Sequence, residues 1–368
     1  MPFLIDPEPN THRHNFDRYA AIQRDNSPRA KIAVVGDIVR ELDVKSGKLF
    51  SGPIGNILSE CLHSAGLISA DVYQTVVIKE PSPSSGNSVA PYWNLKGGFN
   101  ERGKPFVDDL IEELNGLENV DVVIPLGDVA LSALTGYSSI TKYRGYIVDA
   151  PRLDAPKICI PTIHPGKIIR GKYIWKYYMM HDFRKAKDVI KNPDRVNPIR
   201  NFFIYSGDKH AGLVKNFGNI NIEYVDSDTT DKLLDAMFHD RNTIAIDIEC
   251  KNFEVECISF APSPEEVLII DTYTKDISID KELDCWQWIA EIMESPQITK
   301  IGQNFIFDMH FLAYKNGIIT QGPLIDTMLA HSILYPDFDK SLGFLASIYS
   351  YQTYWKDMVK FDNIKKDS

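Results

Sequence analysis

Short apolar segments and amphipathic segments alternate along the first half of this chain. Runs rich in β-branched residues occupy positions 31–36, 72–78, 120–127 and 157–165. Their length and composition predict buried strands. Apolar residues at helical spacing follow at 57–66, 106–116 and 128–135. This alternation predicts a three-layer α/β domain with a mainly parallel sheet, whose functional residues lie beyond the carboxyl ends of the strands.

The second half has a different order of elements. Strand patterns occur at 201–206, 220–225 and 243–249, and we expect residues 257–261 and 267–272 to be the antiparallel neighbours of 243–249. Helical periodicity follows at 286–293, and a further strand at 298–302 leads into a helical segment at 305–315. The pattern predicts a second α/β domain with a mixed sheet.

Two carboxylates interrupt the apolar strand at 243–249. Asp247 and Glu249 occupy alternate positions, so both point to one face of an extended strand. In a buried strand, desolvation and mutual repulsion predict raised pKa values or a bound divalent cation. A solvated edge strand is the alternative, which the uniformly apolar neighbours disfavour. Asp308 lies in the first turn of the segment at 305–315, where the helix dipole alone also favours a carboxylate. We expect Asn304 to be the N-cap of that helix.

These positions resemble the first two motifs of the proofreading 3′–5′ exonuclease domain of family A DNA polymerases. Asp247 and Glu249 match Asp-x-Glu, and Asp308, 61 residues after Asp247, closes an Asn-x-x-Phe-Asp segment preceded by Gly-Gln. The resemblance covers about residues 222–355 and implies an RNase-H-like fold with two Mg²⁺ (or Mn²⁺) ions. It implies that Asp247, Glu249 and Asp308 are catalytic metal ligands, and that Gln303 and Asn304 lie near the DNA.

The last motif of that exonuclease family, Tyr-x-x-x-Asp on a helix, has no match in this sequence. Tyr335 and Asp339 have the spacing, but they follow the segment of Asp326 too early and lie in a turn-forming sequence. We therefore expect an exonuclease domain truncated before its last motif. We expect Asp326 to cap the helix that follows it and not to bind metal.

A set of glycine-containing motifs lies in the first half. Gly36 opens the set, and the other matching segments are Gly47-x-x-Phe50-x-Gly52, Gly55-Asn56-x-Leu58, Pro125-Leu-Gly127-x-x-Ala130, Gly145 and Thr162-x-His164-Pro165. Residues 31–187 thereby resemble the uracil-DNA glycosylase superfamily, most closely its family 4 type. The resemblance implies a pocket in which Phe50 stacks on an extruded base, His164 contacts the sugar and phosphate, and Asp37 positions a water.

The first half departs from the glycosylase pattern at three places. Asp37-Ile-Val-Arg40 replaces the usual Glu-Ala-Pro-Gly after Gly36, and Thr75 or Val76 occupies the place of the asparagine that reads uracil. The cysteines that bind an iron–sulfur cluster are absent, so no cluster is expected. These departures favour a fold retained for DNA binding, or for organising a larger enzyme, over uracil excision.

Charge separates the two halves. The 368 residues suffice for two domains, and the net charge is −10. Residues 1–200 carry 26 basic and 23 acidic side chains, whereas residues 201–368 carry 14 basic and 27 acidic side chains. Residues 152–200 alone have 12 basic against 4 acidic side chains, which indicates DNA contact at Lys167, Arg170 and Lys172. A solvated helix face is the alternative.

The cysteines and the hydropathy bear on the compartment. The five cysteines are widely spaced, without a Cys-x-x-Cys pair, which predicts free thiols and neither a zinc site nor a disulfide framework. The sequence has no run of eighteen apolar residues and no secretory signal. We therefore expect no membrane association and a cytoplasmic location, in the host cytoplasm if the chain is phage-encoded.

Together these patterns predict the N-terminal portion of a phage-type DNA replication polymerase. We expect an N-terminal arm at 1–30 that is either poorly ordered or forms a short helix near 16–24. A glycosylase-like domain at 31–192, a linker with strands at 193–221 and the exonuclease domain at 222–368 follow. The expected partners are single-stranded or primer–template DNA and a polymerase domain in the same chain or a second one. The alternatives are a free-standing nuclease, a non-catalytic DNA-binding or assembly module, and an active uracil-DNA glycosylase.

Overall fold

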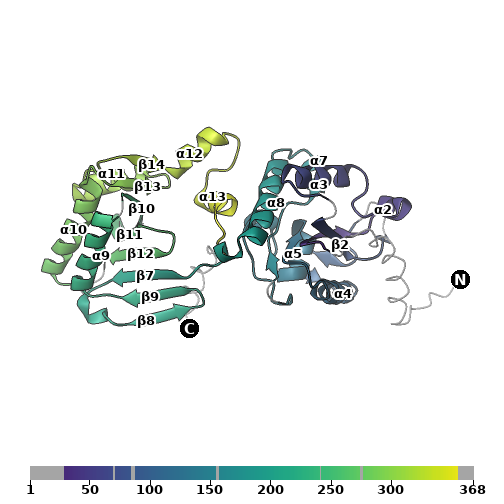
Figure 1. The fold of residues 1–368 in the computed structure, drawn as a ribbon, viewed down its shortest axis with the longest axis horizontal. Helices are drawn as coiled ribbons and strands as arrows, with labels where there is room; N and C mark the ends of the chain where they lie inside the picture. The colour runs from purple at the N-terminus through teal and green to yellow at the C-terminus, as the bar shows by residue number, and fades with distance from the viewer. Residues whose placement is uncertain are drawn as a thin grey trace. The chain divides into compact units, whose positions relative to one another are not determined.

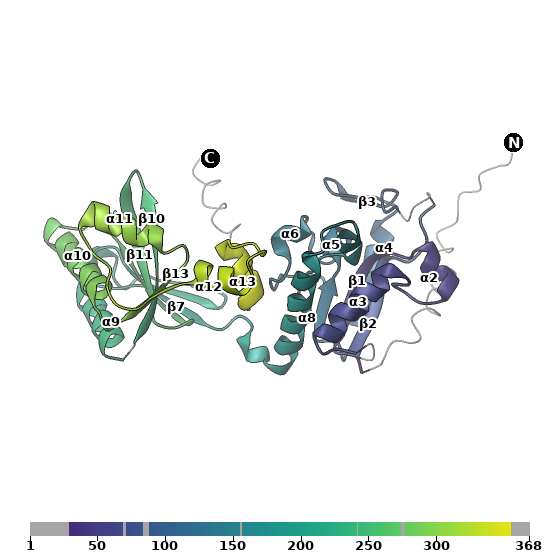
Figure 2. The same cartoon turned by 90° about the horizontal axis from the view of Figure 1, so that it is seen from above.

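The computed structural model describes residues 29–68, 71–83, 88–154, 157–240, 242–273 and 277–354, without the side chains of 237–240. The chain divides into two compact units, shown as ribbons in Figures 1 and 2. The first comprises Met1–Val196 with Gly343–Ser368, and the second comprises Asn197–Leu342. The helix expected near 16–24 lies outside the described residues.

The first unit is built on a four-stranded sheet with the order β2-β1-β5-β6, in which every neighbouring pair is parallel. Gly36 lies opposite Val76 in this register. The last strand is much shorter than predicted, because Pro161 and Pro165 offer no backbone N–H to extend the ladder. The strands are β1 Ile32–Ile38, β2 Val72–Ile78, β5 Val122–Pro125 and β6 Ile158–Cys159.

Helices cover both faces of this sheet. In Figure 1, α3, α7 and α8 lie on one side, and α4 and α5 lie on the other, where they contact β1 and β2. The three-layer prediction is therefore confirmed. The helices are α2 Glu41–Ser46, α3 Pro53–Ser64, α4 Lys104–Asn115, α5 Gly127–Thr135, α6 Ile140–Tyr143, α7 Pro165–Ile169, α8 Trp175–Lys191 and the 3-10 turn η2 Pro193–Arg195; a small hairpin joins β3 Trp93–Asn94 to β4 Gly98–Phe99.

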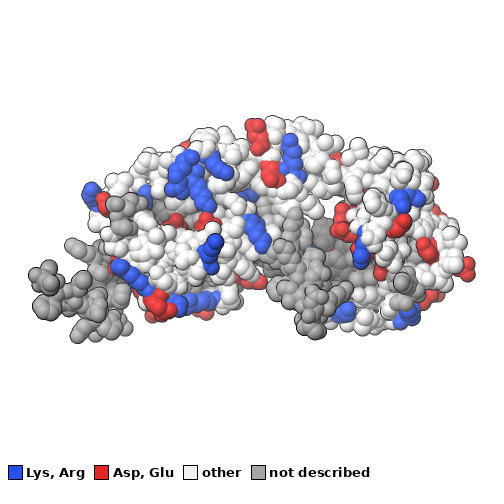
Figure 3. Space-filling model, turned by 180° about the vertical axis from the view of Figure 1, so that it is seen from behind, with Lys and Arg blue, Asp and Glu red and all other residues white. Residues whose placement is uncertain are grey.

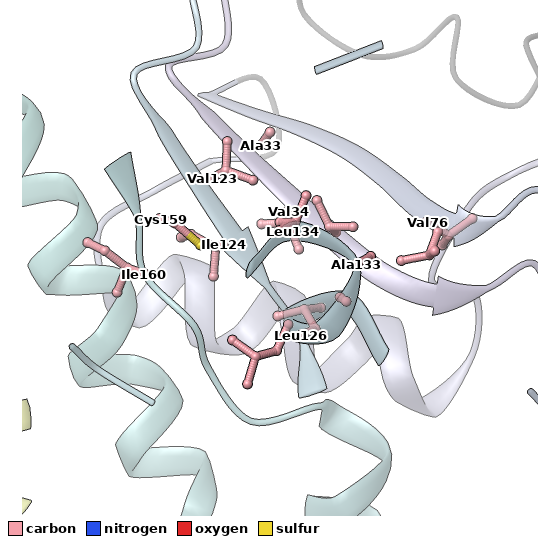
Figure 4. Close-up of a cluster of buried hydrophobic side chains, with 14 of the residues drawn as sticks. Ala33, Val34, Val76, Val123, Ile124, Leu126, Ala133, Leu134, Cys159 and Ile160 are labelled. Atoms are coloured by element: carbon pink, nitrogen blue, oxygen red, sulfur yellow. The ribbon is translucent and has the colours of Figure 1, made fainter. Parts of the chain in front are cut away.

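The core of the first unit lies between the sheet and its helices. Figure 4 shows part of it, with side chains from the four strands and from α5, among them Val34, Ile124 and Leu134. These side chains are buried. Close packing makes such a core rigid, so the loops at the carboxyl ends of the strands start from fixed positions.

The second unit is built on an eight-stranded mixed sheet with the order β14-β13-β10-β11-β12-β7-β9-β8. The central strand β10 runs antiparallel to β11 and parallel to β13. The expectation that residues 267–272 lie beside 243–249 is wrong, because β13 takes the second edge of β10 and β12 pairs with β11. The strands are β7 Arg200–Tyr205, β8 Val214–Phe217, β9 Ile220–Tyr224, β10 Thr243–Lys251, β11 Glu254–Ala261, β12 Glu266–Asp271, β13 Thr299–Gly302 and β14 Leu324–Asp326.

Three helices lie on one side of this sheet, as both ribbon views show: α9, α10 and α11. Ile244, Ile246 and Ile248 of β10 are buried in the core that these helices help to form. The helices of the second unit are α9 Ser227–Asp240, α10 Ile279–Glu294, α11 Ile306–Asn316, α12 Thr327–Leu334 and the 3-10 turn η3 Asp208–His210.

Two of the predicted domain boundaries differ from the structure. Strand β7 pairs in parallel with β12, so strands that we assigned to a linker at 193–221 belong to the second unit. At the other end, the packing of α13 (Leu342–Tyr349) groups Gly343–Ser368 with the first unit. The second compact unit therefore ends earlier than the exonuclease domain at 222–368, whose bounds in the sequence stay a prediction. Both differences arise because strand pairing and packing between residues distant in sequence decide the boundary.

All five cysteines are free thiols, as predicted. Within the part of the chain that the structure describes, no helix has the length and apolar character needed to cross a membrane.

Candidate functional site

Asp247 and Glu249 lie on the exposed face of β10. The strand alternates between buried and exposed side chains, so the prediction of a wholly buried strand is wrong. Its isoleucines pack into the core, whereas the two carboxylates point to the open face, as the period of two requires. Asp247 is paired with Ser259 and Glu249 with Cys257 of β11, so β10 is also no edge strand. The carboxylates therefore stand side by side in the middle of a sheet.

Asp308 is brought to the same strand by α11. Its side chain is only 4% exposed, and its Oδ1 accepts a hydrogen bond of 3.0 Å from the backbone N–H of Ile248. Ile248 is the residue between Asp247 and Glu249. This single bond fixes the buried carboxylate beside the two exposed ones, although 61 residues separate Asp308 from Asp247 in the sequence.

The three carboxylates perturb one another electrostatically. Desolvation raises the pKa of Asp247 to about 6, and the charges of Asp308 and Glu249 add to that shift. Desolvation also raises the pKa of Asp308, while the bond from Ile248 opposes the shift. Carboxylate oxygens under mutual repulsion are the donor type that hard divalent cations prefer. Within the described residues, however, no three acidic, histidine or cysteine side chains close around one point as a metal site.

Asp326 holds the start of two helices at once. Its Oδ1 accepts from the N–H groups of Met328 and Leu329 and so caps α12, as we predicted. The same carboxylate accepts from the N–H of Asn304 at 3.2 Å and of Phe305 at 2.8 Å, ahead of α11. Asp326 therefore ties the helix of Asp308 to β14, and its carboxylate oxygens are engaged by backbone N–H groups.

The prediction that Asn304 is the N-cap of α11 is wrong. Phe305 occupies that position, and Asn304 adopts a left-handed backbone with φ of 56°. Asparagine tolerates that conformation better than most residues, which accounts for its place in the turn. The Asn304 side chain is exposed. Gln303 is engaged internally, because its Nε2 donates to the carbonyl oxygen of Lys340 at 2.8 Å and its Oε1 accepts from Thr327.

Tyr335 and Asp339 lie in the turn that follows α12 and not on a helix, as we expected. The Tyr335 ring stacks on Phe338, and the Asp339 carboxylate accepts from the N–H and hydroxyl of Ser341. Both side chains serve the local turn. The pair supplies no fourth carboxylate next to Asp308.

We expect Asp326→Ala to destabilise the second unit by about 2 kcal/mol, because the carboxylate caps one helix and anchors another. Urea denaturation followed by circular dichroism measures the change. Asp337→Ala is the matched control, since Asp337 is exposed in the neighbouring turn. A loss no larger than that of the control would show that the capping geometry carries no stability.

We expect the stability of the metal-free protein to fall as the pH rises from about 4 to about 6. Asp247 has a raised folded-state pKa of about 6 against 3.8 when unfolded, so the folded state binds more protons in that window. The free energy of unfolding is measured against pH in the presence of a chelator. With rising pH it should decline in the wild type relative to Asp247→Asn, and the two curves should become parallel above about pH 7. Parallel curves across the whole range would contradict the coupling among the carboxylates.

The second candidate site lies at the carboxyl ends of the strands in the first unit. Asp37 is near the end of β1, Gly127 opens α5, and His164 follows β6. The His164 Nδ1 accepts from the N–H of Gly166 at 3.0 Å, so the neutral ring carries its proton on Nε2, 3.9 Å from Asp37 Oδ2. Gly127 must be glycine, because a Cβ there would lie 2.8 Å from the His164 Cβ.

Burial dominates the ionisation of this pair. It raises the pKa of Asp37 and lowers that of His164, and each group opposes the other's shift. Asp37 Oδ1 is buried and has no hydrogen-bond partner among the residues described. An uncompensated acceptor of this kind, beside a ring N–H, can bind a water or a polar ligand group.

Phe50 lies against the same edge of the sheet. Its backbone has a φ of 52°, and its ring is so close to Gly36 that a Cβ there would lie 2.6 Å from it. Val76 is the residue of β2 on this side, whereas Thr75 points to the opposite face and accepts from Lys79. The side chain that β2 places beside Phe50 is thus apolar and offers no hydrogen bond.

The three basic residues chosen from the sequence have different surroundings. Lys167 forms an ion pair of 2.7 Å with Asp128, a partner that the sequence did not reveal. Arg170 and Lys172 are exposed, and Lys172 lies over the ring of Trp175. Figure 3 shows lysine and arginine side chains gathered on one face of the first unit. Arg170 and Lys172 therefore keep their charge available to a solvent-borne anion.

Comparison with known proteins finds a different family in each half of the chain. Residues 24–184 match the model of the uracil DNA glycosylase superfamily, and residues 223–364 match the 3′–5′ exonuclease model. The type-4 uracil-DNA glycosylase of Thermotoga maritima is 31% identical over 164 residues, which cover 44% of this chain and 78% of that protein. A DNA polymerase of Bacillus phage SP01 is 26% identical over 145 residues, or 39% of this chain and 14% of the polymerase.

Among solved structures, Escherichia coli RNase D is 24% identical over 32% of this chain and 29% of that chain, with a TM-score of 0.25. The two resemblances predicted from the motifs are confirmed by the sequence matches. Through its first half this chain belongs to the uracil-DNA glycosylase superfamily, and its second half carries a 3′–5′ exonuclease domain similar to part of a phage DNA polymerase.

Proposed function

We propose that this chain is the N-terminal portion of a DNA replication polymerase, with a proofreading exonuclease in the second unit and a DNA-binding, glycosylase-like domain in the first. The observation that carries the proposal is that the Asp308 carboxylate accepts a hydrogen bond from Ile248, the residue between Asp247 and Glu249, and that Asp308 and Glu249 raise the pKa of Asp247. The similarity to the phage DNA polymerase supports it. We place its action on single-stranded or primer–template DNA, in the cytoplasm of a host cell.

In this proposal Asp247, Glu249 and Asp308 are the residues that hold divalent cations, two Mg²⁺ or Mn²⁺ ions. Such ions, when bound, lower the pKa of an attacking water and stabilise the leaving oxygen of a phosphodiester. The chain's own contribution is placement: the Ile248 amide orients Asp308, and Asp326 holds the start of its helix. The exposed Asn304 is the residue of this turn that can contact a DNA strand.

A nuclease assay tests this proposal. The chain is incubated with 5′-labelled single-stranded DNA and Mg²⁺ or Mn²⁺, alone and with a second polypeptide that carries a Tyr-x-x-x-Asp helix. We expect stepwise shortening from the 3′ end in at least one condition, lost in Asp247→Ala and kept in Asp280→Ala. Asp280 is an exposed carboxylate in the first turn of α10. Shortening that survives Asp247→Ala, or none in either condition, overturns the assignment.

For the first unit we propose DNA binding without uracil excision. The apolar Val76 beside Phe50 supports this, because base recognition requires hydrogen bonds to the base edge. The exposed Arg170 and Lys172 are the proposed phosphate contacts. An active glycosylase is the second candidate, favoured by the Asp37–His164 pair and by the 31% identity to a type-4 enzyme.

Uracil release from single-stranded DNA distinguishes these two candidates. We expect binding that weakens as salt rises and that is reduced in Arg170→Ala with Lys172→Ala, but no release of uracil. Release that is lost in Asp37→Asn and in His164→Ala would establish the second candidate. Release that survives both substitutions would instead contradict the placement of this site.

A further inference from the structure

Two buried cations of the first unit surround a single carboxylate. Arg144 is 4% exposed, Lys185 is 6% exposed, and Asp182 is fully buried. Arg144 Nε donates to Asp182 at 3.2 Å, and Thr162 donates to the same carboxylate at 2.6 Å. One negative charge does not satisfy two buried cations with their many N–H groups. The remaining donors need acceptors from elsewhere in the unit.

Those acceptors come mainly from residues 347–350, which follow the second compact unit in the chain. Arg144 Nη1 donates to the hydroxyl of Ser347 at 2.9 Å. Lys185 Nζ donates to the carbonyl oxygens of Gly145 and Ser350, both at 2.6 Å, and to that of Ser347. Two of these three carbonyls lie at the C-terminal end of α13, where a cation is favoured by the helix dipole.

The contacts continue along residues 343–354. Tyr146 donates to the carbonyl oxygen of Gly343, and the ring of Phe344 lies 4.8 Å from that of Tyr178. Near the other end, Thr353 bridges to Ile147 in parallel, and Tyr354 packs edge-on against two tyrosine rings at 5.1 and 5.2 Å. The segment is thus held at its start, middle and end.

Gly145 must be glycine because residues 343–354 come closest to the rest of the unit at this position. Its backbone has a φ of 74°, and a Cβ would lie 2.6 Å from the carbonyl oxygen of Ser347 and 2.7 Å from Asp182 Oδ1. The receiving surface therefore combines two buried cations with a position that only glycine can occupy while the segment is bound.

We propose that the glycosylase-like unit is the anchor for the chain that leaves the exonuclease unit, with Arg144, Gly145 and Lys185 as the docking site for residues 343–354. The chain passes from the first unit to the second after Val196 and returns after Leu342. Tyr354, the last described residue, therefore lies on the glycosylase-like unit. This role needs neither base excision nor nuclease activity, so it stands or falls separately from the proposed function.

Hydrogen exchange measured on the full chain by mass spectrometry tests the anchor. In the wild type we expect the amides of 343–351 to be protected, together with those of β1 and β2. In Lys185→Met, which leaves the Ser347 and Ser350 carbonyls without their donor, we expect exchange in 343–351 to accelerate about tenfold or more. Lys187→Met is the control, because Lys187 lies on the same helix and donates to Ala65 and Gly66.

Gly145→Ala provides a second, steric test. It should expel the segment, and Gly136→Ala separates this clash from backbone strain, since Gly136 has a φ of 75° with open space around it. The proposal predicts faster exchange in 343–351 for Gly145→Ala than for Gly136→Ala, with β1 and β2 still protected. Equal exchange in both variants, or an unprotected segment in the wild type, overturns it.

Discussion

Asp182→Ala is expected to destabilise the first unit by about 3–5 kcal/mol, because it leaves two buried cations without their counter-ion. Asp182 receives hydrogen bonds from Arg144 and Thr162, and it is fully buried. Burial already lowers the pKa of Lys185 to about 7, and Asp182 opposes that shift. Removal of this charge makes the protonated lysine still more costly to bury.

Denaturant-dependent hydrogen exchange of the β1 and β2 amides measures this loss, since it reports on the first unit alone. Asp182→Asn should lose a similar amount, because it removes the charge and keeps the volume. Asp194→Ala, an exposed carboxylate in the turn η2, should change stability by less than about 0.5 kcal/mol. A loss confined to Asp182→Ala would assign the effect to a cavity and not to charge.

Gly55→Ala is expected to destabilise the first unit by more than about 4 kcal/mol, because a Cβ at this position would meet backbone. The added atom would lie 1.6 Å from the carbonyl oxygen of Phe50. Phe50 is itself held at a φ of 52°, with its ring packed over Gly36, so its carbonyl cannot move away without displacing the ring. The same hydrogen-exchange experiment measures the change.

Gly116→Ala is the matched control for this substitution. Gly116 has a right-handed helical backbone at the end of α4, and a Cβ there would meet its neighbours at 3.5 Å, an ordinary contact. Its effect should be within about 0.5 kcal/mol of zero. If Gly55→Ala were equally mild, the close approach of α3 to Phe50 would not be a packing constraint, and the pocket edge would be adaptable.

The candidate nuclease site shows which features local sequence patterns can predict. Asp247 and Glu249 were found from their alternation in an apolar strand, and Asp308 from its place at the start of a helix. The sequence did not reveal that only one face of β10 is buried, because that depends on which side the helices cover. Our prediction of the cap of α11 was also wrong. The turn before that helix is held by Asp326, which lies 22 residues after Asn304 and could not be recognised from local sequence.

At the glycosylase-like site, too, local patterns predicted some features and the fold decided others. The motifs located Asp37, Phe50 and His164 at the ends of strands, because strand ends and glycine turns are local features. Whether Thr75 or Val76 lies on the side of Phe50 depends on the register of β2 against β1, and a shift of one residue reverses the face. The pairing of the strands shows that Val76, the apolar residue of the two, lies on that side.

The sequence by itself determined the order of strands and helices, the two family resemblances and the carboxylates of the candidate nuclease. Hydrophobic period, turn residues and motif spacing are properties of neighbouring residues, so they can be recognised without a fold. Only the tertiary structure decided that residues 343–354 belong to the glycosylase-like unit. That assignment rests on the buried charges of Arg144 and Lys185, whose acceptors on α13 lie more than 160 residues away in the chain.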